Sequence, residues 1–215
     1  EPDVSVFSSA KPLGYEVWAV GDFDGDGPPD LLVHSTNAPE LLLVRGPIGP
    51  GEKLDLDGAP GGRVFSFFDS SNLQYFAQTV TAPGDFNGDG RGDIVFVGSS
   101  RTDDMGILFG HDPASAQTDI VELAAAGGPI VRLHEGRYSI LNGGKNLRAA
   151  GDINGDGFAD VLLYSIDGQD NLGYAAALLG RPEPVGVIPW EDELEGSGAF
   201  LVLGEDPVEL FGHGA

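Results

Sequence analysis

The sequence predicts an all-β protein of β-propeller type, built from blades of four antiparallel strands. The main observation is a repeat: GDFDGDGPPDLLV begins at Gly21, GDFNGDGRGDIVFV at Gly84 and GDINGDGFADVLLY at Gly151. The first aspartates of successive copies are 63 and 67 residues apart, which leaves room for one four-stranded unit with its turns. The 34 glycines and 15 prolines among 215 residues favour short strands and tight turns over long helices.

The strands of each repeat follow one order. An apolar or small-residue stretch precedes each loop, at 17–20, 76–80 and 147–150. A β-branched or leucine run follows each loop, at 31–33, 94–97 and 161–164, so each loop joins two strands. Third strands closed by glycine are predicted at 40–46, 106–110 and 173–180. Fourth strands follow glycine-rich turns at Gly61 and Gly127, and the one helix candidate of note is 119–126.

We expect a single domain over residues 1–215, with blades at about 14–75, 76–142 and 143–204. Residues 1–10 and 205–215 are interpreted as terminal closing strands, the first resembling the fourth strand of another blade, and the two ends could pair to close a ring. Two interpretations of the C-terminal region stay open. Residues 191–199 form a degenerate fourth loop, or 199–203 is simply the fourth strand of the third blade.

The three loops have the composition of calcium sites. Counted from the first aspartate, each offers oxygen ligands at positions 1, 3, 5 and 9, and glycine at position 6 permits a sharp turn that brings them together with the carbonyl of position 7. Oxygen ligands without His or Cys select a hard cation, and several protein ligands favour Ca²⁺ over Mg²⁺. The predicted ligands of the three Ca²⁺ ions are Asp22, Asp24, Asp26, Pro28, Asp30, Asp85, Asn87, Asp89, Arg91, Asp93, Asp152, Asn154, Asp156, Phe158 and Asp160.

Two other interpretations of the loops fail. Asp-Gly and Asn-Gly pairs are good turn formers, which explains one such loop but not three. An EF-hand needs flanking helices and a glutamate at position 12, where this chain has Val33, Phe96 and Leu163 inside predicted strands.

The combination of GDFNGDGRGDIVFVG with a following GILFG resembles the FG-GAP repeat of integrin α-subunits and of many bacterial surface proteins. The resemblance covers most of the chain. It implies a β-propeller blade with calcium held in the hairpin between its first two strands. It differs from the family in number, because family propellers close with about seven blades and propellers need at least four. A fragment, an assembly of several copies and an unusually small or open arrangement are therefore all open.

Composition excludes several classes of partner. Acidic residues outnumber basic ones 34 to 11, and the net charge of −23 makes nucleic acid a poor partner. No run of 18 apolar residues occurs, so membrane insertion is not expected. The chain has no cysteine and no Asn-x-Ser/Thr acceptor, which favours an exported bacterial protein, extracellular or at the cell surface, over a eukaryotic secreted one.

No catalytic motif is present, and we expect no enzymatic activity. Arg91-Gly92-Asp93 spells the tripeptide that integrins recognise, but Asp93 is position 9 of a loop and should already be engaged. Trp18 is expected in the core, whereas Trp190 precedes the acidic EDELEG segment and is a candidate contact residue.

The sequence therefore predicts an extracellular calcium-binding module for recognition or adhesion, with a protein or glycan ligand. A carbohydrate-binding lectin and a self-associating structural protein are the alternatives.

Overall fold

The computed structural model describes residues 4–7, 16–34, 40–56, 62–71, 76–98, 104–134, 146–165, 174–182, 186–189 and 199–203. The regular secondary structure of these segments is β-strand apart from one short helix, and most strand pairs are antiparallel. The all-β prediction is confirmed. Within the described segments, no helix has the length and hydrophobicity to span a bilayer.

Three sheets contain four antiparallel strands each, in the order predicted for a blade. We call them blade 1, blade 2 and blade 3. Blade 1 contains β2 (Glu16–Gly21), β3 (Asp30–His34), β4 (Glu40–Val44) and β6 (Val64–Phe68). Blade 2 contains β7 (Thr79–Gly84), β8 (Asp93–Val97), β9 (Asp104–Leu108) and β11 (Ile130–His134). Blade 3 contains β12 (Asn146–Gly151), β13 (Asp160–Ser165), β14 (Tyr174–Leu178) and β16 (Ala199–Leu203).

The C-terminal strand resolves one alternative from the sequence. β16 pairs antiparallel with β14, with Ala199 opposite Leu178, so this segment is the fourth strand of blade 3. The acidic segment 191–198, which would carry a degenerate fourth loop, lies outside the described residues, as does Trp190.

A second kind of strand links each unit to the one before it. β5 (Glu52–Asp55), β10 (Gln117–Asp119) and β15 (Gly186–Pro189) each lie in the connection between the third and fourth strands of a unit. β10 pairs in parallel with β6, and β15 pairs in parallel with β11. Each therefore extends the outer edge of the preceding blade.

The N-terminal strand follows the same rule. β1 (Val4–Phe7) pairs in parallel with β5, as β6 does with β10. It thus holds the place of the fourth strand of a preceding blade, as its sequence suggested. Its partner among the described residues is β5, and the suggested pairing of the two chain ends stays a prediction. Residues 205–215 lie outside the described residues.

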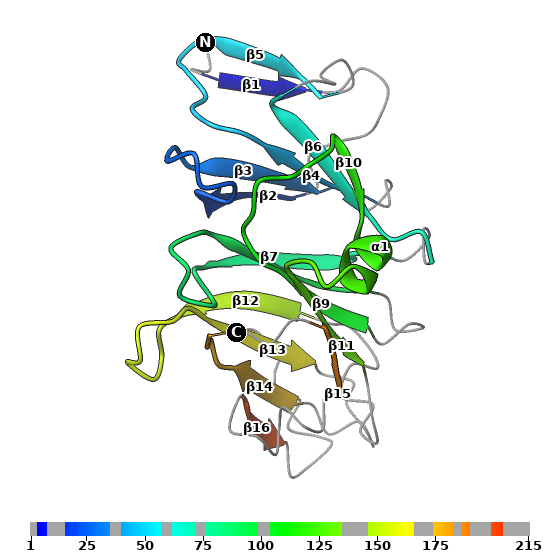
Figure 1. The fold of residues 1–215 in the computed structure, drawn as a ribbon. Coiled ribbons are helices and arrows are strands. Elements are labelled where there is room, and N and C mark those ends of the chain that lie inside the picture. The colour runs from blue at the N-terminus through cyan, green and yellow to red at the C-terminus, as the bar shows by residue number, and fades with distance from the viewer. Residues whose placement is uncertain are drawn as a thin grey trace.

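Figure 1 shows the sheets as successive layers, with the β1–β5 pair at the top and blade 3 at the bottom. The first strands of the blades are neighbours, since β7 contacts both β2 and β12. The loops that join first and second strands project on one side, at the left of the view, and the helix α1 (Ile120–Ala125) lies on the other. The layering therefore gathers all three candidate metal loops along one edge of the molecule.

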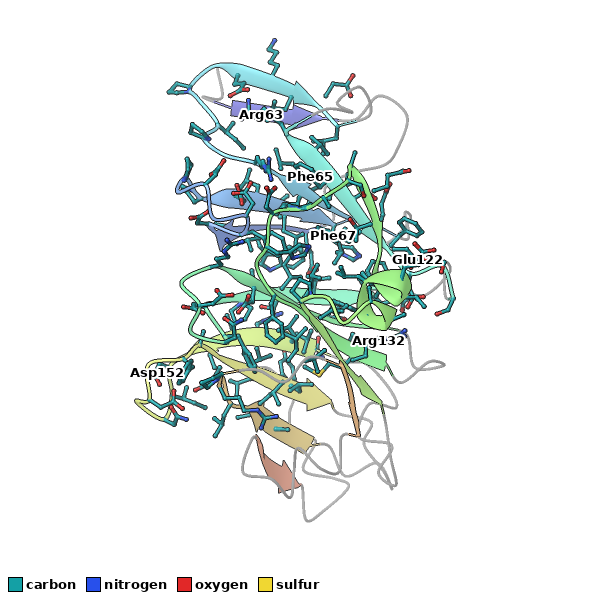
Figure 2. All side chains as sticks on the ribbon, viewed as in Figure 1. Arg63, Phe65, Phe67, Glu122, Arg132 and Asp152 are labelled. Carbon is teal, nitrogen blue, oxygen red and sulfur yellow. The ribbon has the colours of Figure 1, made fainter. Side chains whose placement is uncertain are left out.

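The core lies between the layers. Side chains alternate along a strand, so β3 sends Leu32 to the cluster between blades 1 and 2 and Val33 to the cluster on the opposite face of blade 1. Similarly, β8 sends Ile94 toward blade 1 and Val95 toward blade 3. Figure 2 shows the side chains filling these spaces, with Phe65 and Phe67 on β6. Both faces of blade 2 are buried, which explains why all of β8 is apolar after Asp93.

The predicted helix forms as a short insertion before β11. Asp119 caps its N-terminus, because its carboxylate accepts a hydrogen bond from the Val121 N–H. Ile120 is fully buried in the cluster between blades 1 and 2, which also takes up part of Trp18. The helix therefore covers the core on the side away from the loops.

Candidate metal-binding loops

Each loop begins at an irregularity in the pairing of the first and second strands of its blade. The pairing of β2 with β3 shifts between Ala19 and Gly21, and the other two hairpins shift at the same place. Glycines at loop positions 4 and 6 have positive φ, for example 80° at Gly88 and 87° at Gly90. This backbone conformation suits glycine, and it turns the chain back on itself twice within six residues. The sequence predicted the turn at position 6 but not the one at position 4.

The aspartate at position 1 organises the loop backbone. We number the loops after their blades: loop 1 is residues 22–30, loop 2 is residues 85–93 and loop 3 is residues 152–160. In loop 2, the Asp85 carboxylate accepts hydrogen bonds from the N–H groups of Gly88, Asp89 and Gly90, at 2.6–3.0 Å. The Asp152 carboxylate accepts the equivalent three bonds in loop 3. In loop 1, Asp22 accepts bonds from Gly25 and Gly27. The loop therefore curls around its first carboxylate, as a cation-binding turn must.

The aspartate at position 9 fastens the loop to the third strand. The Asp93 carboxylate accepts one hydrogen bond from the Phe86 N–H at 2.7 Å and another from the Gly110 N–H at 2.8 Å. Asp30 and Asp160 make the same two bonds, to Phe23 and Gly46 and to Ile153 and Gly180. All three carboxylates are fully buried. The closing glycine of each repeat is thus the partner of position 9.

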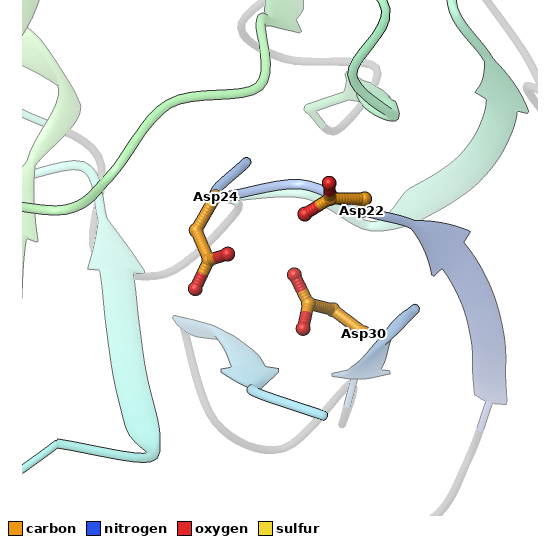
Figure 3. Close-up of side chains that lie close together, drawn as sticks. All are labelled: Asp22, Asp24 and Asp30. Atoms are coloured by element: carbon orange, nitrogen blue, oxygen red, sulfur yellow. The ribbon is translucent and has the colours of Figure 1, made fainter. Parts of the chain in front are cut away.

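Loop 1 brings three carboxylates together. Ligand oxygens of Asp22, Asp24 and Asp30 all lie within 4.8 Å of one another, and Figure 3 shows the three side chains facing a common space. Asp24 and Asp30 are buried, so their mutual repulsion is poorly screened. This all-oxygen donor set fits a hard divalent cation such as Ca²⁺. Asp26, at position 5, is exposed and lies outside the cluster.

Loops 2 and 3 do not form such a cluster among their described residues. Asparagine replaces aspartate at position 3, and its side-chain amide donates to the position 5 carboxylate, from Asn87 to Asp89 and from Asn154 to Asp156. The same carboxylates accept the N–H of position 7, from Arg91 and Phe158. Figure 2 places Asp152 on the loop farthest out from the sheets. The side-chain oxygens of loops 2 and 3 are engaged in hydrogen bonds within the turn and do not point to a common centre as those of loop 1 do.

Burial changes the acidity of Asp30 and Asp93, the position 9 aspartates of loops 1 and 2. It raises the pKa of Asp93 to about 7, although the N–H groups of Gly110 and Phe86 stabilise the charged form and act against this rise. Burial also raises the pKa of Asp30, against the same kind of hydrogen bond from Gly46 and Phe23. A carboxylate in this setting gains from a nearby cation, because the cation compensates for the hydration lost on burial.

Successive loops are joined to one another. The Asp22 carbonyl accepts a hydrogen bond from the Gly92 N–H at 3.0 Å, and the Asp85 carbonyl accepts one from the Ala159 N–H at 2.9 Å. A Cβ atom at Gly92 would lie 1.8 Å from the Val20 carbonyl oxygen, so a side chain at this position would displace the Val20 backbone. Position 1 of one loop therefore contacts position 8 of the next.

The tripeptide at 91–93 is not available for recognition. Asp93 is fully buried, and both of its carboxylate oxygens accept backbone hydrogen bonds. The expectation that this side chain is engaged in the loop is confirmed, although its partners here are backbone N–H groups.

Arg45 was not among the functional residues predicted from the sequence. Its Nε pairs with the Asp24 carboxylate, another guanidinium nitrogen pairs with Asp112, and the guanidinium carbon lies 4.5 Å from the centre of the Phe65 ring. One signal was available in the repeat: Arg45 directly precedes a closing glycine, where blades 2 and 3 have Phe109 and Leu179.

Two histidines near blade 1, the buried His34 and the half-buried His111, make the fold sensitive to acid. Burial lowers the pKa of His34 and of His111, and the His111 ring packs against Phe23 and Phe67. Below the unfolded-state pKa of about 6.5, the unfolded chain binds protons that the folded chain resists until a lower pH. Their contribution to stability is therefore complete above about pH 6.5 and is lost as the pH falls.

We expect the double variant His34→Gln/His111→Gln to lose less stability than the unmodified chain between pH 7.5 and 5.5. Urea unfolding at constant calcium and ionic strength measures the free energy of unfolding of both proteins at each pH. The difference between their pH dependences removes the effect of titratable groups that both proteins have. Equal pH dependences would show that these histidines do not set the acid response.

Comparison with known proteins identifies relatives among integrin α chains. The chain is 29% identical over 178 residues to integrin alpha-V of Gallus gallus, covering 82% of this chain and 16% of that protein. It is 24% identical over 217 residues to integrin alpha-PS2 of Drosophila melanogaster, covering 91% of this chain and 14% of that protein. No family model matches the chain. The chain thus spans a small part of the length of these relatives, and the similarity agrees with an integrin α-type fold.

Proposed function

We propose that this chain is a non-enzymatic, extracellular recognition or adhesion module whose blade hairpins are made rigid by calcium. The observation that carries the proposal is the loop that occurs three times with a shared set of hydrogen bonds. In each loop the carboxylate at position 1 accepts hydrogen bonds from the N–H groups of the turn, and the buried carboxylate at position 9 accepts one from the glycine after the third strand. Similarity to integrin alpha-V, whose name places it among the integrins, supports a role in recognition.

Each proposed calcium site uses one loop. Side-chain oxygens at positions 1, 3, 5 and 9 and the carbonyl oxygen at position 7 are the proposed ligands. Those carbonyls belong to Pro28, Arg91 and Phe158. We assign the ions a structural part, because they would neutralise the buried carboxylates and hold each hairpin against its neighbour. In this view residues 1–215 act as one propeller-type domain.

Extracellular calcium suits such sites. Modules with this kind of ligand bind calcium with dissociation constants of about 10⁻⁴ to 10⁻³ M, well above cytosolic concentrations. A net charge of −23 also keeps the protein dispersed in saline. The edge formed by the three loops would then be ordered outside the cell, and the proposed ligand is a protein.

The test is binding of the purified chain to an array of extracellular-matrix proteins and to a glycan array, with calcium at about 1 mM or with EDTA. We expect calcium-dependent retention on protein spots. Retention on glycans alone would assign the chain to the lectins. Retention that persists unchanged in EDTA, or none on either array, would overturn the proposed function. Solution mass measured in parallel reports whether copies self-associate.

A further inference from the structure

We infer that Arg45 is a built-in counter-cation of loop 1 and makes that loop bind calcium more weakly than an otherwise equal loop without it. This inference rests on the proposed function, since it concerns the same three sites. Its evidence is independent, because it comes from the ion pairs of one side chain and from a comparison of the three repeats.

The position of Arg45 is fixed on three sides. Its guanidinium pairs with Asp24 in loop 1 and with Asp112 after the third strand of blade 2, and it lies over the Phe65 ring. The Asp24 side chain is 1% exposed and that of Arg45 is 21% exposed. An ion pair with one fully buried partner is screened little by solvent, so it differs from an ordinary surface pair.

The three repeats differ at two positions together. Loop 1 has an aspartate at position 3 and an arginine before the closing glycine. Loops 2 and 3 have asparagine at position 3, and the residue before the closing glycine is Phe109 or Leu179. The additional carboxylate thus occurs in the one repeat that has an arginine directly before its closing glycine. With Arg45 included, loop 1 has the same formal charge as loop 3, whereas loop 2 carries its own arginine, Arg91, at position 7.

The pairing has a direct consequence for a cation. An ion entering the cluster of Asp22, Asp24 and Asp30 must either displace the guanidinium from Asp24 or bind beside a positive charge. Both cost free energy relative to the same loop without a guanidinium paired to a ligand carboxylate. In exchange, Arg45 neutralises a buried carboxylate when no ion is bound. Loop 1 is therefore the one least dependent on calcium for its structure.

The test measures calcium binding to loop 1 alone. Asp89→Ala and Asp156→Ala, at exposed position 5, disable loops 2 and 3, and calcium titration calorimetry then reports the first site. In this background we expect Arg45→Met to bind calcium about tenfold more tightly, because it removes a positive charge and frees Asp24. Arg148→Met, which removes one positive charge from exposed β12, is the matched control and should leave the affinity unchanged.

A second variant keeps the inference testable if Arg45→Met folds poorly. Arg45→Leu combined with Asp24→Asn gives loop 1 the residue pair of the other loops and leaves no buried charge unpaired. We expect its affinity to match that of loop 3, measured with the other two loops disabled. Equal affinities for the starting protein and Arg45→Met, or weaker binding in both Arg45 variants, would overturn the inference. Failure of loops 2 and 3 to bind calcium in the unmodified chain would instead overturn the proposed function.

Discussion

Removal of calcium with excess EDTA lowers the thermal unfolding midpoint of this chain by many degrees. A site held at about 100 times its dissociation constant stabilises the folded state by roughly 2.7 kcal/mol, so three independent sites give roughly 8 kcal/mol. For a chain of this size, 1 kcal/mol shifts the midpoint by about 2–4 °C. We therefore expect a shift of about 16–32 °C, measured by scanning calorimetry in about 10 mM calcium and in EDTA.

Magnesium at equal concentration is the control for general charge screening. Because Mg²⁺ requires a near-ideal octahedral site and retains much of its water, it should restore only a small part of the shift. An equal midpoint in calcium, magnesium and EDTA would mean that the loops are ordinary turns and that the ions have no structural part.

Replacement of Asp93 by alanine destabilises the chain even without calcium. The substitution leaves the buried N–H groups of Phe86 and Gly110 without their partner, and each unsatisfied group costs about 1–3 kcal/mol. We expect a loss of about 4 kcal/mol in the free energy of unfolding, measured by urea titration in EDTA. The loss should be larger in calcium, because Asp93 is also a proposed ligand.

Asp89→Ala is the matched control in the same loop. Asp89 is exposed, and its carboxylate makes contacts only within the turn, to Arg91 and Asn87. It should therefore cost little in EDTA but should lose much of the calcium-induced stabilisation at that loop. Similar losses for both variants in EDTA would contradict the assignment of position 9 as the residue that fastens the loop to the third strand.

The repeat made the blades predictable from the sequence. Three copies of one loop fixed where the first hairpins lie, and glycines such as Gly46 marked the ends of the third strands. The physical reason is local: apolar runs and turn residues within each copy specify the hairpin without help from distant segments. The structure adds that Gly46 donates to Asp30, which explains why that glycine and that aspartate belong to one motif.

The linking strands were not predictable in the same way. β10 is a three-residue strand, Gln-Thr-Asp, whose hydrogen bonds come from β6 in the preceding blade. Such a segment has no apolar alternation, because its pairing depends on the placement of a neighbouring unit. Arg45 was missed for a similar reason, since its partners Asp24 and Asp112 lie in two different blades.

The count of bound calcium ions tests the central claim most directly. Native mass spectrometry of the full chain, after dialysis against about 1 mM calcium, should show three ions per chain. Asp156→Ala should remove one of them, and Asp89→Ala together with Asp156→Ala should remove two. A chain that carries no calcium under these conditions, or the same number in all three proteins, would contradict the assignment of the repeated loops as calcium sites.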